Sequence, residues 1–237
     1  MPQAQRLLLA GATGLIGGEV VDRLLGDANW RGRLLVPARR ALTQSDPRLR
    51  VRVGSLDDGE NLPRLRQELA TLLEGEALDV FVSCLGTTIR TAGSREAFIA
   101  VDRELVLRLA AVAQEFGARR AIMVSSVGAS RQSGNFYLRV KGEVEDELER
   151  LGFERLDILR PGLLLGDRQE HRSGEAAARA LAPWINPLMA GRKLRRYRAI
   201  EAEVVARAIA RLSAETAPGI HLHEYDSIRR WADSPLP

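Results

Sequence analysis

The sequence predicts an α/β protein built on a Rossmann-like, doubly wound parallel sheet. Apolar strand-like runs alternate with helical runs, a glycine-rich turn follows the first run, and polar residues collect where the later strands end. The composition agrees with one large α/β domain, because the 237 residues are 45% hydrophobic and 28% charged. We therefore treat 1–237 as a single domain.

The elements follow from the apolar pattern. We expect strands at Arg6 to Ala10, Arg33 to Pro37, Leu49 to Val53, Leu78 to Cys84, Ala121 to Ser125 and Arg155 to Leu159. We expect helices at Gly14 to Leu25, Leu62 to Leu73, Arg95 to Phe116, Phe136 to Leu151, Gly174 to Leu181 and Glu201 to Ser213. Ligands of such a sheet bind at the carboxyl ends of its strands.

The glycine-rich turn runs from Gly11 to Gly17, between the first strand and the first helix. This arrangement places a dinucleotide pyrophosphate on a helix N-terminus. Gly11 would make the tight turn, Gly14 would let phosphates approach the backbone, and Gly17 would let the helix pack closely on the strand. An ordinary glycine turn is the alternative interpretation. The glycines also interrupt the apolar stretch, so we expect no secretory signal.

Two arginines, Arg39 and Arg40, follow the second strand, where a protein that uses NAD usually offers an acid to the ribose. A guanidinium matches a 2′-phosphate in charge and geometry, so the pair favours NADP(H) over NAD(H). A solvated basic turn is the alternative.

The next two strand ends would complete the cofactor site. Ser55 and Leu56 follow the third strand, where Ser55 stands in place of the acid that often holds adenine; its hydroxyl, the backbone or a neighbouring aspartate would make that contact. Leu85, Gly86 and Thr87 follow the fourth strand and would run along the nicotinamide ribose. Cys84 beside them is expected to be a small buried hydrophobe.

The reaction chemistry is predicted after the fifth strand. Tyr137 and Lys141 lie four residues apart on one helix face. A phenol with its ordinary pKa of about 10 is a poor acid–base group at neutral pH. An ammonium one turn away stabilises the phenolate and can also hold ribose hydroxyls. Ser125 or Ser126, at the strand end, would polarise a substrate carbonyl.

Three stretches resemble one known family: DVFVSCLGTT at Asp79 to Thr88, NFYLRVKGEVE at Asn135 to Glu145, and LRPGLLLGDRQEHRSGE at Leu159 to Glu175. The chain is similar to atypical or extended short-chain dehydrogenases/reductases, and within them to the Tat-interacting-protein oxidoreductase family. The resemblance covers nearly the whole chain, and its third stretch is the most specific.

The resemblance implies an NADPH site and a role for each matching residue. Phosphate contacts fall to Thr13, Gly14, Leu15 and Ile16, and ribose-phosphate contacts to Arg39 and Arg40. Nicotinamide-side contacts fall to Leu85 and Gly86, acid–base roles to Tyr137 and Lys141, and further cofactor contacts to Leu164 and Arg172. The substrate-side region would be built from roughly 161–200 and 214–237.

Other ligands are not expected. The net charge of +4 comes mostly from scattered arginines. The one dense cluster, Arg192 to Arg198, is short. We interpret it as a strand edge before the next helix, or as the source of one arginine that selects an anionic substrate. Neither nucleic acid nor a membrane is an expected partner. His221 and His223 lack a third ligand, so no metal site is predicted. Cys84 is the single cysteine, which excludes a disulfide framework.

The predicted function is therefore hydride transfer between NADP(H) and a carbonyl or alcohol substrate, with a cytoplasmic location and a possible homodimer. Two other functions stay open. The first is an NADPH-binding regulator or sensor without turnover. The second is an epimerase or dehydratase that acts on a nucleotide-linked sugar.

Overall fold

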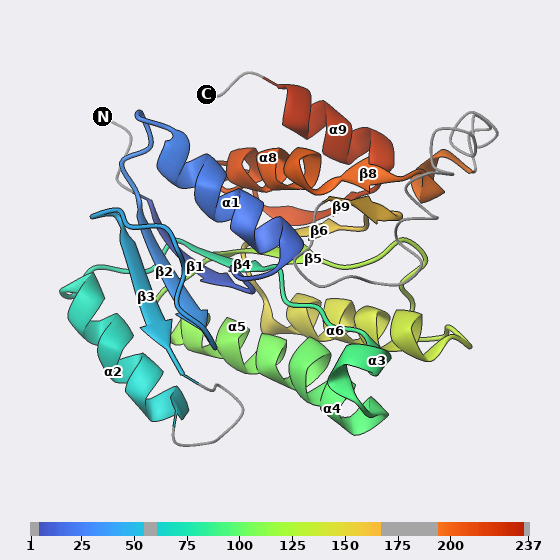
Figure 1. The fold of residues 1–237 in the computed structure, drawn as a ribbon, viewed down its shortest axis with the longest axis horizontal. Helices are drawn as coiled ribbons and strands as arrows, with labels where there is room; N and C mark the ends of the chain where they lie inside the picture. The colour runs from blue at the N-terminus through green and yellow to red at the C-terminus, as the bar shows by residue number, and fades with distance from the viewer. Residues whose placement is uncertain (1–4, 55–60, 167–193, 235–237) are drawn as a thin grey trace.

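The centre of the fold is a seven-stranded sheet in the order β3-β2-β1-β4-β5-β6-β9 (Figure 1). The structure is a computed structural model that describes residues 5–54, 61–166 and 194–234. The strands are β1 (Arg6–Ala10), β2 (Arg33–Ala38), β3 (Leu49–Val53), β4 (Val80–Ser83), β5 (Arg120–Val124), β6 (Arg155–Leu159) and β9 (Gly219–His223). Every neighbouring pair is parallel. The predicted fold class is confirmed.

Helices cover both faces of this sheet (Figure 1). One face carries α1 (Leu15–Gly26), α8 (Ala202–Leu212) and α9 (Tyr225–Asp233), and the other carries α2 (Asn61–Leu73), α5 (Val106–Glu115) and α6 (Phe136–Leu151). The core is correspondingly divided: Leu7 and Leu9 of β1 face one cluster, and Leu8 faces the other. Burial on both faces explains why the central strands β1 and β4 read as continuous apolar runs.

Most predicted boundaries hold within two residues, and one predicted helix does not. The segment Arg95 to Phe116 is divided into α4 (Arg95–Ile99), a π-helical stretch η1 (Ala100–Leu105) and α5. Such π-turns insert one extra residue and are frequent at functional sites. The break places the buried side chain of Asp102 toward α6, as described below.

The basic cluster was predicted as a strand edge, and its described part is not a strand. Arg195–Tyr197 forms a 3₁₀ turn, η2, before the two-residue strand β8 (Ile200–Glu201), which pairs with β7 (Leu164–Leu165). Ion pairs explain the difference, because Arg195 contacts Asp226 at 2.8 Å and Arg196 contacts Glu224 at 3.6 Å. Both acids belong to the start of α9, which thus fixes the turn beside it. The short helix α3 (Ile89–Ala92) completes the described elements.

The start of α6 is fixed by its own sequence. The Asn135 side chain accepts a hydrogen bond from the Leu138 backbone N–H at 3.2 Å, a typical N-cap contact. Gly152 ends the helix in the left-handed conformation. These caps place Tyr137 in the first turn, at the carboxyl edge of the sheet.

Candidate active site

The glycine turn has the geometry that its sequence predicts. Gly11 has a φ of +85°, and a Cβ at this position would lie 2.6 Å from the carbonyl carbon of Cys84. Its carbonyl accepts a hydrogen bond from the N–H of Gly14 at 3.0 Å. A Cβ on Gly17 would lie 2.1 Å from the Gly11 oxygen, so the close approach is to the turn that follows β1. Only glycine fits at both positions.

The N-terminus of α1 is open to an anion. Its N-cap, Gly14, has no side chain to cap the helix, and the first turn holds no acidic residue. The first-turn N–H groups and the positive end of the helix dipole therefore favour a negatively charged group. Thr13 and Gly14 are exposed and Leu15 is half-buried, whereas the buried Ile16 side chain belongs to the core. Ile16 could contact a cofactor only through its backbone.

The two arginines after β2 are available to a ligand. Arg39 and Arg40 are exposed and follow the last residue of the strand, Ala38. Within the described residues neither guanidinium is part of an ion pair, whereas many other arginines of the chain are paired. This position is the one that the sequence assigns to a 2′-phosphate.

Behind the turn after β4 lies a buried charge pair. The Lys141 ammonium is 2.8 Å from Oδ1 of Asp102, and the two side chains are 3% and 0% exposed. Asp102 Oδ2 accepts a hydrogen bond from the Thr87 N–H at 2.8 Å, and Lys141 donates to the Leu85 carbonyl at 3.4 Å. The pair therefore holds the Leu85–Thr87 backbone, and a Cβ on Gly86 would lie 3.8 Å from both charged groups.

This pair keeps Lys141 charged. Burial lowers the pKa of Lys141, but the attraction of Asp102, Tyr137 and Glu145 outweighs burial and raises that pKa above its ordinary value. An ammonium is thus held in a dry environment one helical turn from the Tyr137 phenol.

Tyr137 and the two serines lie at the same edge. Tyr137 is half-buried, and its ring packs against Phe98 with centroids 5.8 Å apart. Ser125 directly follows β5 and is 5% exposed, and its hydroxyl has no hydrogen-bond partner among the described residues. Ser126 is half-buried. A buried hydroxyl without a partner is costly, and a bound carbonyl would satisfy it.

The apolar pattern did not predict Asp102 as a site residue, because it places Asp102 inside one long helix and gives the residue no role. A signal was present, since Asp102 lies on the apolar stripe formed by Phe98, Leu105 and Leu109, all of them buried. A carboxylate on a buried stripe requires a partner of opposite charge.

Three predicted residues, Ser55, Leu56 and Arg172, lie outside the described residues, as does the predicted helix Gly174 to Leu181. Leu164 is half-buried in β7. Nearby, a Cβ on Gly166 would lie 2.6 Å from a methyl group of Leu15, so this segment passes the start of α1. The cofactor contact that the resemblance implies for Leu164 stays a prediction.

Cys84 is half-buried, and not fully buried as predicted, because it lies just beyond the last residue of β4. It is not a candidate nucleophile. Burial raises the pKa of its thiol to about 12, so the thiolate is scarce at neutral pH. The described residues contain no group of His, Cys, Asp and Glu side chains that could hold a metal ion. None of the helices in the described ranges is long and apolar enough to cross a membrane.

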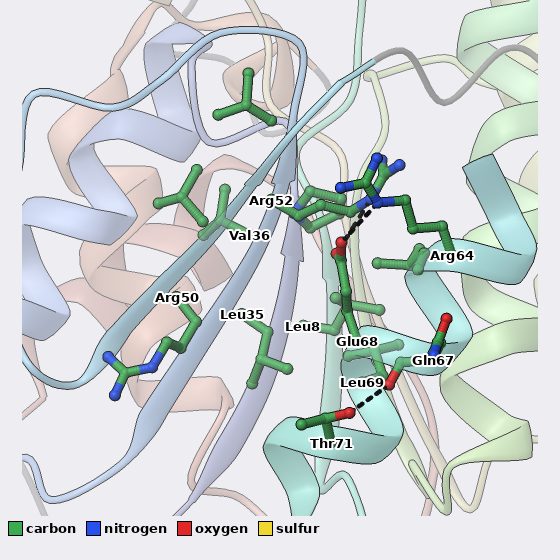
Figure 2. Close-up of a pocket in the computed structure, with 14 residues that line it drawn as sticks. Leu8, Leu35, Val36, Arg50, Arg52, Arg64, Gln67, Glu68, Leu69 and Thr71 are labelled. Carbon is green, nitrogen blue, oxygen red and sulfur yellow. Dashed lines mark hydrogen bonds and ion pairs between the residues drawn. The ribbon is translucent and has the colours of Figure 1, made fainter.

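A cavity of about 610 Å³ lies elsewhere, between the β2–β3 edge of the sheet and α2 (Figure 2). Leu8, Leu35 and Leu69 form its apolar wall, and Arg52 contacts Glu68 at 3.1 Å across it. None of the predicted catalytic residues lines this cavity. It is therefore separate from the proposed reaction centre.

The seven-stranded parallel sheet and the glycine turn between β1 and α1 define a Rossmann-type nucleotide-binding protein. Residues 11–215 match the model of a family described as NAD(P)H-binding. The chain belongs to this NAD(P)H-binding family, and the predicted resemblance is confirmed.

Relatives and solved structures agree with this assignment. Protein HTATIP2 of Rattus norvegicus is 39% identical over 75% of this chain and 70% of its own length. The mitochondrial protein fmp52 of Aspergillus clavatus is 34% identical over 89% and 88%. A short-chain dehydrogenase from Leptospira borgpetersenii with bound NAD⁺ matches 95% of this chain and 93% of its own, with a TM-score of 0.69 and 14% identity. This last likeness shows the fold alone.

Proposed function

We propose that the protein is an NADP(H)-dependent oxidoreductase that transfers hydride between the nicotinamide and a carbonyl or alcohol carbon. The buried Asp102–Lys141 pair, one helical turn from Tyr137, carries this proposal. Burying two charges is expensive, and a chain that only needed a stable helix contact would do as well with apolar residues. A charged lysine beside a tyrosine at the ligand edge of the sheet serves proton transfer.

The chain's own residues divide the work. The α1 N-terminus binds the pyrophosphate, and Arg39 with Arg40 binds the 2′-phosphate. The Leu85–Thr87 backbone, held by Asp102 and Lys141, lines the ribose side. Nicotinamide, when bound, supplies or accepts the hydride. Tyr137 gives a proton to the carbonyl oxygen or takes it from the alcohol, while Lys141 stabilises the phenolate.

One serine orients the substrate oxygen. Ser125 is the stronger candidate of the two, because its buried hydroxyl has no partner among the described residues. A donor hydrogen bond from this hydroxyl would polarise a carbonyl for hydride attack. Ser126, the next residue, is half-buried.

Single-turnover kinetics with Tyr137→Phe tests this proposal. The variant removes the proton donor and keeps the ring packing on Phe98. We expect NADPH affinity to change by less than about threefold, while oxidation of bound NADPH by a panel of carbonyl compounds slows by about 100-fold or more. Unchanged turnover on any substrate of the wild-type protein would contradict the acid–base role. NADPH binding without turnover on the whole panel would favour a regulator.

A nucleotide-sugar epimerase is the second candidate function. One neighbour in fold is the ADP-L-glycero-D-manno-heptose-6-epimerase of Helicobacter pylori, with a TM-score of 0.64 and 16% identity. An arginine-lined cavity of about 370 Å³ beside the ends of β6 and β9 favours an anionic substrate. An epimerase would interconvert a nucleotide sugar without net consumption of NADPH, which absorbance at the reduced nicotinamide band distinguishes from net reduction.

A further inference from the structure

A second cluster of chemical groups lies where α9 meets the sheet. His223, the last residue of β9, has its Nε2 atom 2.8 Å from Oδ1 of Asp157 on β6. Its Nδ1 atom is 2.9 Å from the Ser227 hydroxyl oxygen in the first turn of α9. Three elements thus contribute an acid, an imidazole and a hydroxyl to one hydrogen-bonded row. The proposed reductase site uses none of these residues.

The direction of these hydrogen bonds follows from the partners. Arg155 holds both Asp157 oxygens, at 2.6 and 2.8 Å, so Asp157 is a carboxylate that only accepts. The Nε2 atom of His223 therefore donates to Asp157, and in the neutral form of the imidazole this tautomer leaves the Nδ1 lone pair facing Ser227. Ser227 donates its proton to this lone pair. This is the arrangement of a serine nucleophile and its base, with the two ring nitrogens exchanged relative to the chymotrypsin arrangement.

His223 and Asp157 are buried, whereas the Ser227 hydroxyl is accessible from a cavity. Asp157 and His223 are 1% and 5% exposed, whereas Ser227 is half-buried and lines the cavity of about 370 Å³. The buried Asp157 carboxylate fixes the orientation of the His223 imidazole. The cavity gives a substrate access to the Ser227 hydroxyl. If these hydrogen bonds only attached α9 to the sheet, the Ser227 hydroxyl would not need to lie at the cavity wall.

The same cavity can hold negative charge. Four arginines line it, against two acids, Glu224 and Asp226. Three of the arginines are ion-paired, Arg160 with Glu145, Arg195 with Asp226 and Arg196 with Glu224. The fourth, Arg230, is exposed and makes no ion pair with any residue that the structure describes. The first turn of α9 adds N–H groups that no carbonyl of that helix accepts. Positive charge beside the hydroxyl would stabilise an oxyanion and attract an anionic substrate.

We propose that Ser227, His223 and Asp157 form a second catalytic site that hydrolyses small carboxylic esters bearing a negative charge. Ser227 Oγ attacks the ester carbonyl carbon as its proton passes to His223 Nδ1. The carbon–oxygen bond to the alcohol breaks, and the leaving oxygen takes that proton. Water then attacks the acyl group on Ser227, His223 accepts the water proton, and the carboxylic acid leaves as the proton returns to Ser227.

Hydrolysis of 4-nitrophenyl acetate and of the anionic 4-nitrophenyl hemisuccinate by the full-length chain tests the proposal. We expect wild-type turnover of both esters, and a loss of about 100-fold or more in Ser227→Ala. Ser234→Ala is the matched control, because Ser234 lies just beyond the same helix and its hydroxyl only donates to the Arg230 carbonyl. Arg230→Gln should raise KM for the hemisuccinate several-fold and leave that for the acetate unchanged.

Two further measurements keep the outcome decisive. A fluorophosphonate should label Ser227 in the wild-type protein. In the Ser227→Cys variant, iodoacetamide should alkylate the new thiol much faster than Cys84, because burial raises the pKa of the Cys84 thiol to about 12. Both reactions should survive Tyr137→Phe, so failure of the reductase proposal does not affect them. The proposal is overturned if Ser227→Ala retains the wild-type rate, or if no label reaches Ser227 while Ser227→Ala only lowers the unfolding temperature. The row would then be structural.

Discussion

Asp102→Asn is the most informative single change, because it removes one charge of the buried pair and nearly preserves its shape. The amide oxygen of asparagine can still accept from the Thr87 N–H, so the turn after β4 keeps its hydrogen bond. Lys141 stays buried and loses the carboxylate that lies 2.8 Å away. The change therefore isolates the electrostatic part of the contact.

The expected magnitude follows from this distance. At 2.8 Å and an effective dielectric constant of about 20, the attraction is about 6 kcal/mol. Desolvation of both groups offsets much of this in the wild type, whereas in the variant the lysine is desolvated without compensation. We expect the free energy of unfolding at pH 7 to fall by about 3–5 kcal/mol.

The effect should depend on pH with a definite sign. The folded pKa of Lys141 is raised, so the wild type has the full stabilisation below the unfolded pKa of about 10.5 and loses it as pH rises through the folded value. In Asp102→Asn, burial dominates and lowers the pKa of Lys141 in the folded state. Deprotonation of Lys141 therefore raises the free energy of unfolding of the variant as pH rises. The difference in stability between the two proteins should therefore shrink from pH 7 toward pH 10.

Urea unfolding at both pH values measures this difference. Glu104→Gln is the matched control, since Glu104 is an exposed carboxylate in the same π-helical stretch, and its loss should cost less than about 0.5 kcal/mol. A loss below about 1 kcal/mol in Asp102→Asn would refute the reasoning, as would a difference that stays constant with pH. In the assay of carbonyl reduction, the same variant should lose turnover more than NADPH affinity.

Two further predictions concern the arginine pair and the glycine turn. Replacing Arg39 and Arg40 by serine should weaken NADPH binding by about 10–100-fold and NADH binding by less than about threefold in calorimetry, because only NADPH carries the 2′-phosphate; equal losses would contradict this assignment. Gly17→Ala should lower the free energy of unfolding by about 2–4 kcal/mol, since its Cβ would lie 2.1 Å from the Gly11 oxygen. Gly18→Ala, whose Cβ meets nothing nearer than 3.6 Å, is its control and should be neutral or slightly stabilising.

The sheet could be predicted from the sequence because each of its signals is local. The strands at Arg6–Ala10, Leu49–Val53 and Arg155–Leu159 have the predicted bounds. Arg6–Ala10 and Arg155–Leu159 are buried along their whole length, whereas Leu49–Val53, at the sheet edge, is recognised by its alternation of apolar residues with arginines. The glycine turn is equally local, because its φ angle and close contacts involve residues that follow one strand. The end of β4 was less predictable, because Leu78 and Cys84 look like strand residues but lie beyond its ladder with β5.

Long-range contacts explain what could not be predicted. The row from Asp157 through His223 to Ser227 depends on β9 pairing beside β6, which only the folded sheet reveals. In the sequence these residues are separated by up to 70 positions, and the two histidines of β9 read as an incomplete metal site. Ion pairs with the start of α9 likewise turned the basic cluster into a 3₁₀ turn.

Asp102 and Lys141 show how a long-range contact can still be inferred from two local patterns. Lys141 shares the buried stripe of α6 with Val144 and Leu148, just as Asp102 shares one with Phe98 and Leu105. A charge on such a stripe cannot be solvated, so each of the two requires a buried partner of opposite sign. Helices that follow adjacent parallel strands pack on the same face when their crossovers run in the same direction. The amino-acid pattern alone therefore predicts that two buried charges of opposite sign on such helices, here Asp102 and Lys141, contact each other.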